Sequence, residues 1–277
     1  SYSQSPNSYS QSPNSYSDSY KPSDSISQSR GNRFYRSPKD FGRSQDRSNE
    51  GQEEEPWSPK LPPAVILSDD EVETNYQTER QFYKAKLEKY QQQRTLRGGV
   101  EFTLNMIPNG SFEMGSDVDE DNERPRHKVK MCFPLLVGET LVTQALYERV
   151  MTQANFKFRG KQYPAESVTW AEAIDFCNRL SQLEGLKSAY ELGSKGIKWI
   201  RESNGYRLPT EAEWEYFSRA GVASVYAGSN NLDLVGWYQN NSNECTQAVR
   251  QKRENAWGLY DISGNVWEWC YDTYMET

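Results

Sequence analysis

The charge of this 277-residue chain is unevenly distributed, with a net charge of −7 and a mean hydropathy of −0.94. Residues 1–100 carry 14 basic and 14 acidic side chains, whereas residues 101–277 carry 18 and 25, so the second part holds the whole net charge. An acidic part without a basic stripe has no electrostatic footprint for nucleic acid. No apolar run is long enough to span a bilayer. We therefore expect no nucleic-acid partner and no membrane span.

The sequence contains four cysteines and one histidine, which limits its chemistry. Cys132, Cys177, Cys245 and Cys270 are widely spaced, form no CxxC motif and are too few for a disulfide scaffold, so we expect free thiols. His127 is the only histidine, which excludes most His-based metal sites and a Ser-His-Asp triad unless His127 itself serves. Its basic neighbours offer no second ligand, so a structural role is expected.

The first 63 residues have the composition of a disordered segment. They open on the repeat SYSQSPN and are rich in Ser, Tyr, Gln, Asn and Pro. Such a segment buries too little apolar surface to offset the entropy of ordering it. We therefore expect residues 1–63 to be a disordered arm. The start at Ser1, inside a repeat, suggests a piece of a longer protein.

Residues 64–99 are expected to contain one amphipathic helix. Ser68 is its candidate N-cap, and Gly98-Gly99 would end it near Arg97. Its apolar residues recur at helical spacing: Val72, Tyr76, Tyr83, Leu87 and Tyr90. Because this stripe contains fewer than four clean heptads, we expect packing on the following domain rather than a coiled coil.

Residues 100–277 have the pattern of an α+β domain with much irregular structure. Residues 100–106 and 111–115 read as the two strands of a hairpin around the turn 108–110. Thr143 is placed to cap a short helix that reaches Met151. Thr169 and Thr210 each precede a glutamate by three residues, the spacing of a capping box.

Residues 255–270, NAWGLYDISGNVWEWC, are the most distinctive segment of the chain. Three tryptophans, two glycines and two acidic residues fit neither a strand nor a helix pattern, and Ser263-Gly264-Asn265 reads as a tight turn. Asp261 and Glu268 flank this turn. Carboxylates and turn carbonyls together supply the oxygen ligands that Ca²⁺ prefers. Alternatively, the two carboxylates cap the backbone or pair with nearby arginines.

Six segments in the same order resemble the sulfatase-modifying factor family, whose domain is similar to formylglycine-generating enzymes. The resemblance covers residues 101–274 and implies a variant of the C-type lectin fold. Its segments are GSFEMGS, ERPRHKVK, GETLVTQALYERVM, PAESVTWAEAIDFCNRLS, GYRLPTEAEWEYFSRAG and NAWGLYDISGNVWEWC.

The resemblance implies a structural Ca²⁺ in the last segment. By position, Asp261 and Glu268 would bind it through side-chain oxygens, and Gly264 and Val266 through backbone carbonyls. Since a Ca²⁺ site needs this mixture of ligands, the residues themselves support the same expectation.

Two departures from the catalytic members bear on function. Members that oxidise a cysteine to formylglycine use two cysteines beyond the WEW motif, and none of the four cysteines here matches those positions. We assign no catalytic residue, and expect copper only if the parent protein has a complete catalytic segment. The stretch between Trp237 and Asn255 is also shorter than in those enzymes. We expect the domain to lack its C-terminal part.

These observations leave three hypotheses for function. The first is a Ca²⁺-stabilised binding or scaffold module for a protein or peptide partner, which the short stretch after Trp237 favours. The second is a fragment of a formylglycine-generating oxidoreductase, which the strength of the family signature supports. In the third, the repeats of the arm drive weak multivalent association, and the folded domain is cargo.

Overall fold

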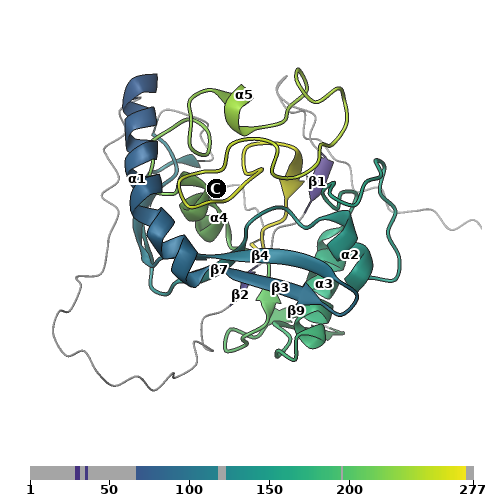
Figure 1. The fold of residues 1–277 in the computed structure, drawn as a ribbon. Helices are drawn as coiled ribbons and strands as arrows, with labels where there is room; N and C mark the ends of the chain where they lie inside the picture. Colours follow the sequence, from purple (N-terminus) through teal and green to yellow (C-terminus); the bar gives the residue numbers. More distant parts are fainter. Residues whose placement is uncertain (1–28, 32–34, 37–66, 118–122, 195, 273–277) are drawn as a thin grey trace, which may run out of the picture.

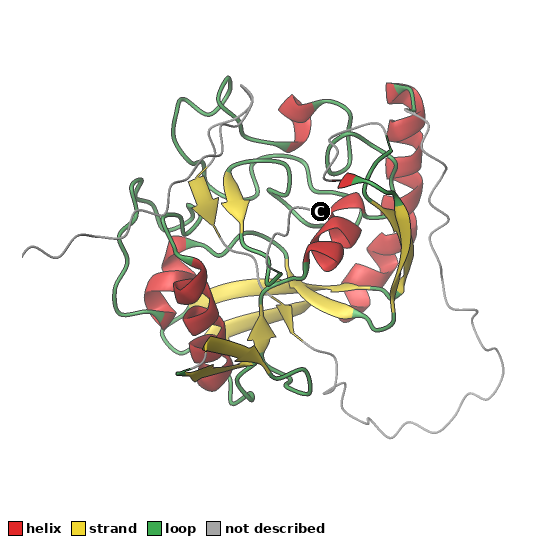
Figure 2. Cartoon of the chain, turned by 180° about the vertical axis from the view of Figure 1, so that it is seen from behind, coloured by secondary structure: helices red, strands yellow, loops and turns green. Residues whose placement is uncertain are grey.

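A five-stranded antiparallel sheet crosses the middle of the molecule (Figures 1 and 2). This computed structural model describes residues 29–31, 35–36, 67–117, 123–194 and 196–272. The strands lie in the order β10 (Tyr206–Arg207), β2 (Tyr35–Arg36), β7 (Leu135–Gly138), β4 (Val100–Ile107) and β3 (Gln92–Leu96). All four residues of β7 are buried, as expected for a strand with neighbours on both edges.

Three smaller two-stranded sheets surround the main one. They are β5 (Gly110–Met114) with β6 (His127–Met131), β8 (Tyr190–Gly193) with β9 (Gly196–Trp199), and β1 (Ser29–Gly31) parallel to β11 (Val266–Glu268). The two strands predicted at 100–106 and 111–115 are present, but the predicted hairpin between them is wrong. Both edges of β4 are taken by β3 and β7, so β5 pairs with β6 instead.

Helix α1 (Asp69–Tyr90) begins at Ser68 with a complete capping box, as the sequence predicts. Its buried side chains belong to the hydrophobic core, which confirms packing on the domain; they are Val72, Tyr76, Tyr83 and Leu87. The prediction that the helix continues to about Arg97 is wrong. Gln91 is already extended, and the next five residues form β3 and pair with β4. Gly98 and Gly99, both with positive φ, turn the chain between these strands.

The other helices confirm the local capping signals. They are α2 (Gln144–Val150) behind Thr143, α3 (Trp170–Leu183) behind Thr169, α4 (Glu211–Arg219) behind Thr210 and the short α5 (Leu232–Val235). The threonines before α3 and α4 both form capping boxes. Every helix in the described ranges is too short or too polar to cross a lipid bilayer.

Two large hydrophobic clusters form most of the core of the described residues, and a small third one contains Leu141, Val249 and Val266. One joins α2 and α3 to the main sheet, and the other fills the space between α1, α4 and residues 256–262. Figure 1 shows the corresponding arrangement, with α1 and α4 on one side of the molecule and α2 and α3 on the other. The second cluster makes the irregular segment 256–262 part of the core rather than a surface loop.

The predicted disordered arm, residues 1–63, falls almost entirely outside the described residues. Only residues 29–31 and 35–36 are described, and these form β1 and β2. β2 occupies an interior position of the main sheet, because it pairs with β7 on one edge and with β10 on the other. The low-complexity composition gives no signal for this pairing, since β2 takes its place through backbone hydrogen bonds.

Candidate metal-binding loop and the cavity beside it

The segment Asn255–Cys270 is an irregular loop that is as deeply buried as the helices. Trp257 is fully buried and its ring lies 5.9 Å from that of Tyr83 and 5.0 Å from that of Tyr216, measured between centroids. Trp267, in contrast, is 53 % exposed. The tryptophans of this segment therefore have different roles, and Trp257 joins the loop to α1 and α4.

Asn255 organises the start of this loop. Its Oδ1 accepts hydrogen bonds from the backbone N–H groups of Trp257 and Leu259, at 3.0 and 3.1 Å. Its Nδ2 donates to the carbonyls of Phe217 and Ser218 at the end of α4. Asn255 is only 1 % exposed, so water does not reach these polar groups. The hydrogen bonds of its side chain therefore give the backbone groups their partners.

Asp261 is a buried carboxylate in a left-handed backbone conformation. Its side chain is 2 % exposed, its φ is 58°, and its Oδ2 accepts the N–H of Arg250 at 2.9 Å. A carboxylate at such a depth is costly unless hydrogen bonds or a cation balance it. The carboxylate of Asp261, which the sequence predicts as a ligand, therefore lies where a bound cation would stabilise it.

Gly264 brings the turn against a second segment of backbone. A Cβ at this position would lie 2.3 Å from the carbonyl oxygen of Trp237, and its φ is 133°, so no other residue type fits. The N–H of Asn265 donates to the same Trp237 oxygen at 2.8 Å, and the Gly264 carbonyl accepts the N–H of Val266 at 2.8 Å. The sequence prediction of a tight turn at 263–265 is confirmed.

Glu268 lies in β11, two residues after Val266. Its carboxylate is among the groups that raise the pKa of the Cys270 thiol, whereas the Asp261 carboxylate accepts a hydrogen bond from Arg250. Across the described residues, no group of three or more His, Cys, Asp or Glu side chains could hold a metal ion. An ion in this loop would therefore need backbone carbonyls as well as the two carboxylates, and such an all-oxygen set suits Ca²⁺.

All four cysteines are free thiols, as expected. Burial is the main cause that raises the pKa of Cys177 on α3. Burial also raises the pKa of Cys270, and the carboxylates of Glu268 and Glu211 add to the effect. A raised pKa keeps both thiols protonated at neutral pH, and the thiolate is the reactive form. Cys132 is exposed and Cys245 is half-buried.

His127 and Asn241 both make local hydrogen bonds to the backbone. His127 lies in β6, is exposed, and has Nδ1 2.9 Å from the carbonyl of Pro125. Asn241 accepts the N–H of Tyr238 and donates to the carbonyl of Gly236, which makes it a turn-forming residue.

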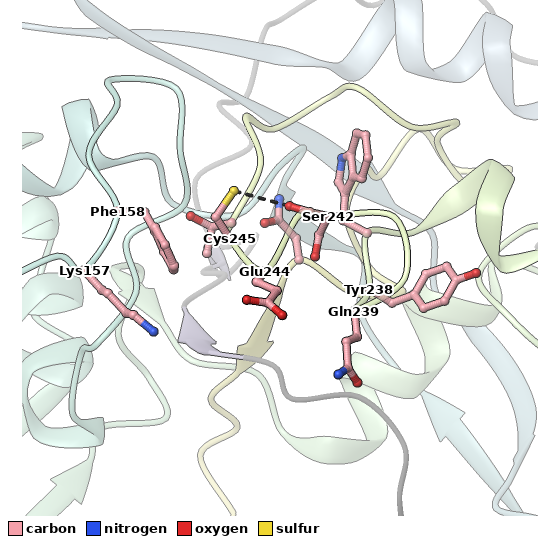
Figure 3. A pocket seen from close by; sticks show the side chains of 10 residues that line it. Lys157, Phe158, Tyr238, Gln239, Ser242, Glu244 and Cys245 are labelled. Atoms are coloured by element: carbon pink, nitrogen blue, oxygen red, sulfur yellow. Dashed lines mark hydrogen bonds between the residues drawn. The ribbon is translucent and has the colours of Figure 1, made fainter.

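A cavity of about 420 Å³ lies beside the loop (Figure 3). Its lining comes from residues 157–158, residues 237–246 and Asn265: Lys157, Phe158, Trp237, Tyr238, Gln239, Ser242, Glu244, Cys245, Thr246 and Asn265. Sequence reasoning missed this site because its two walls are about 80 residues apart in the chain. The dense polar and aromatic stretch GWYQNNSNECTQ was the available signal for one wall.

Comparison with known proteins places this fold in a family. Residues 100–277 match the family described as "Sulfatase-modifying factor enzyme 1-like domain". Among solved structures, Treponema denticola variable protein 1 superposes with a TM-score of 0.64 and 32 % identity, over 68 % of this chain and 78 % of that one.

Two similar proteins have names that indicate different functions. The chaperone protein LppX of Paenibacillus barcinonensis is 39 % identical over 172 residues, which are 49 % of this chain and 61 % of that protein, so the chain spans about three fifths of this relative. A formylglycine-generating enzyme of Streptomyces coelicolor is 28 % identical over 235 residues, covering 66 % of this chain and 71 % of the enzyme. By the match over residues 100–277, the chain belongs to the sulfatase-modifying factor family.

Proposed function

We propose that this chain is a Ca²⁺-stabilised binding module of the sulfatase-modifying factor family, which engages a protein or peptide partner. The observation that supports the proposal is the buried carboxylate of Asp261, which begins a short segment that also contains Gly264, Val266 and Glu268. Ca²⁺ would supply the charge that balances this loop. The ion would stabilise the fold and take no part in a reaction.

A binding role, rather than catalysis, is supported by the state of the thiols. Cys177 is buried on α3, and burial raises the pKa of its thiol. This thiol is therefore not prepared to act as a thiolate nucleophile or metal ligand. The relative named as a chaperone gives a precedent in this family for a role in binding proteins.

Calcium titration tests the metal. A ligand that binds only the folded chain stabilises it by RT ln(1 + [L]/Kd), about 2.7 kcal/mol at a hundredfold excess over Kd. We expect Ca²⁺ to raise the Tm relative to a chelator. Mg²⁺ should raise it less, because it prefers a more rigid octahedral site. The shift should be lost in Asp261→Asn and in Glu268→Gln.

The matched control is Asp175→Asn, which removes a carboxylate from the outer face of α3, where it pairs with Arg179. This variant should keep the full Ca²⁺ response. Since the measured quantity is the Ca²⁺-dependent shift rather than the Tm itself, a general destabilisation of Asp261→Asn does not affect the conclusion. An unchanged Tm in excess Ca²⁺ would refute the metal proposal.

The second candidate is the oxidoreductase, which the 28 % identity with a formylglycine-generating enzyme favours. Incubating the purified chain with copper, oxygen and a cysteine-containing peptide decides between the two functions. The binding module leaves the peptide mass unchanged. Conversion of the cysteine to an aldehyde, detected by mass spectrometry, would replace the binding proposal with the enzymatic one.

A further inference from the structure

The strand β2 fills a slot between β7 and β10 in the main sheet. Each of its two residues is in register with one residue of β7 and one of β10. These four neighbours are all buried; they are Leu136, Val137, Tyr206 and Arg207. Because backbone groups at this depth need hydrogen-bond partners, the slot requires an extended segment between the two strands.

β10 depends on this segment for its place in the sheet. It is the last strand in the order, and β2 is its strand neighbour. Elsewhere the backbone of this region is bound by side chains: the N–H of Tyr206 donates to the hydroxyl of Ser181, and the N–H of Leu208 donates to the hydroxyl of Tyr190, both at 2.8 Å. Among the described residues, β2 alone joins β10 to β7 by strand pairing.

Both faces of the slot are apolar. Val137 belongs to the hydrophobic cluster that contains α1 and α4, whereas Leu136 and Tyr206 belong to the cluster that contains α2 and α3. Successive residues of a strand point to opposite faces, and residues opposite each other share a face. The slot therefore favours a strand with β-branched or aromatic side chains at both positions.

A long connection separates β2 from the rest of the domain. Residues 37–66 lie between it and Leu67, and the strand before it, β1, pairs with β11 of the metal-binding loop (Figure 1). Pairing of backbone with backbone holds both strands. β2 is thus comparable to a peptide ligand that is tethered to its own site, at an effective concentration on the order of millimolar.

We propose that the slot between β7 and β10 is the site at which the binding module takes an extended segment of a partner protein, with β2 as an intramolecular competitor. The partner segment adds as a strand through backbone hydrogen bonds. It has no proline at the slot positions and places an apolar side chain on each face. A second copy of this chain is not the occupant, because exchanging identical strands gains no pairing and loses the tether.

Three synthetic peptides probe the slot by fluorescence anisotropy with the full chain. They are labelled SRGNRFYRS, the sequence of residues 29–37, the same peptide with Arg36→Val, and the same peptide with Tyr35→Pro. Arg36→Val should tighten binding about fivefold or more, because valine favours strands and both faces of the slot are apolar. Tyr35→Pro should abolish binding, because proline lacks the N–H that an interior strand needs. Equal binding of the proline peptide would overturn strand addition.

Arg36→Pro in the full chain tests the intramolecular competition. This change should empty the slot, so the Arg36→Val peptide should bind about fivefold or more tightly than it binds the unmodified chain. The matched control is Ser17→Pro, which lies in the arm before β1 and should leave binding unchanged. No gain in the Arg36→Pro chain would show that β2 does not compete, and the proposal would fail.

Hydrogen exchange of the unmodified chain gives the answer even if Arg36→Pro does not fold. A saturating amount of the Arg36→Val peptide should make residues 29–36 exchange about fivefold faster or more, since they are displaced. Residues 135–138 should keep their protection, because the new strand replaces β2. Mass spectrometry of pepsin fragments measures both. Binding without faster exchange at 29–36 would place the peptide elsewhere and overturn the proposal.

The oligomeric state tests the choice of occupant. Analytical ultracentrifugation of the unmodified chain should detect no dimer that Arg36→Pro abolishes. Such a dimer would make a second copy the occupant and overturn the choice of a partner protein.

This proposal rests on the binding function but not on its metal, so the two can fail separately. Displacement of β2 by the peptide without a Ca²⁺-dependent shift in Tm would refute only the metal. A Ca²⁺-dependent shift without displacement would refute only the slot.

Discussion

The described parts of residues 67–221 and residues 222–272 are both well packed, but their backbone groups find hydrogen-bond partners in different ways. The first region contains the four described helices that carry serine or threonine caps and most of the strands, so its backbone groups pair with one another. The second has only α5 and β11 as regular elements, and the amide side chains of Asn241, Asn255 and Asn265 bond to its backbone. Because buried backbone groups need partners, each of these amides replaces part of a ladder. When one of these amide side chains is removed, no neighbouring strand or helix takes over its hydrogen bonds.

The largest expected effect is that of Asn255→Ala. It removes four hydrogen bonds at a position that is 1 % exposed, and we expect a loss of roughly 3–4 kcal/mol in the free energy of unfolding. Asn178→Ala is the matched change in α3, where the side chain makes two bonds to Tyr190. It should cost about 1–2 kcal/mol. Urea denaturation measures both, and equal losses would contradict the contrast between the two regions.

In the regular region, Glu213→Gln is expected to have the next largest effect. Arg207 donates two hydrogen bonds of 2.7 Å to Glu213, and their side chains are 9 % and 14 % exposed. Removing one charge of such a pair leaves the other uncompensated, so we expect a loss of about 3 kcal/mol near neutral pH. Glu148→Gln, in an exposed pair with Arg159, should change stability by less than about 1 kcal/mol.

The effect of Glu213→Gln should depend on pH. Burial acts to raise the pKa of Glu213, but the hydrogen bonds and charge of Arg207 outweigh it and hold the pKa below its ordinary value of 4.5. Stability from a lowered pKa is present above the unfolded pKa and is lost as pH falls through the folded one. The unfolding free energies of the two proteins should therefore converge in acid. A constant difference down to acidic pH would show that the charge is not the cause.

The elements that the sequence predicts well are those with local causes. The capping boxes at Thr169 and Thr210 depend on residues three positions apart, so they can be recognised without knowing the fold. Strand pairing cannot, because it depends on which edges are free. The pairing of β5 with β6 instead of β4, and the early end of α1 at Tyr90, both follow from the partners of β4.

The candidate site shows the same division. Asp261, Gly264, Val266 and Glu268 lie within one short segment of the sequence, so a local motif selects them. The cavity joins Phe158 to Thr246 across 88 positions, and the unsatisfied hydroxyl of Thr246 becomes evident only after packing. Resemblance to a family can predict the four loop residues, whereas the residues around the cavity are recognised only from the folded structure of this chain.

Deleting residues 1–66 tests whether the regular region depends on the arm. β2 contributes only two residues, but it pairs with β7 and β10 on its two edges. At about 0.5–1.5 kcal/mol for each backbone hydrogen bond, we expect a loss of roughly 1–2 kcal/mol. Deleting residues 1–28 keeps both strands and should change stability little. If the two deletions melt alike, neither β1 nor β2 contributes to stability.

The smallest expected effect concerns Glu79 on α1, the helix that joins the two regions. Glu73 and Arg80 of this helix pair with Arg253 and Glu254 of the irregular region, whereas Oε2 of Glu79 is buried without a hydrogen-bond partner among the described residues.

Burial raises the pKa of Glu79, and the Lys86 ammonium only partly opposes it. A raised carboxyl pKa gives stability that is full below the unfolded pKa and is lost as pH rises through the folded one. Glu79→Gln should therefore match the unmodified chain in acid and exceed it by a fraction of a kcal/mol at pH above neutral. Thermal melts at several pH values measure this difference. A less stable variant above neutral pH would mean that the Glu79 carboxylate has a favourable partner, and that α1 is held by charge on both of its sides.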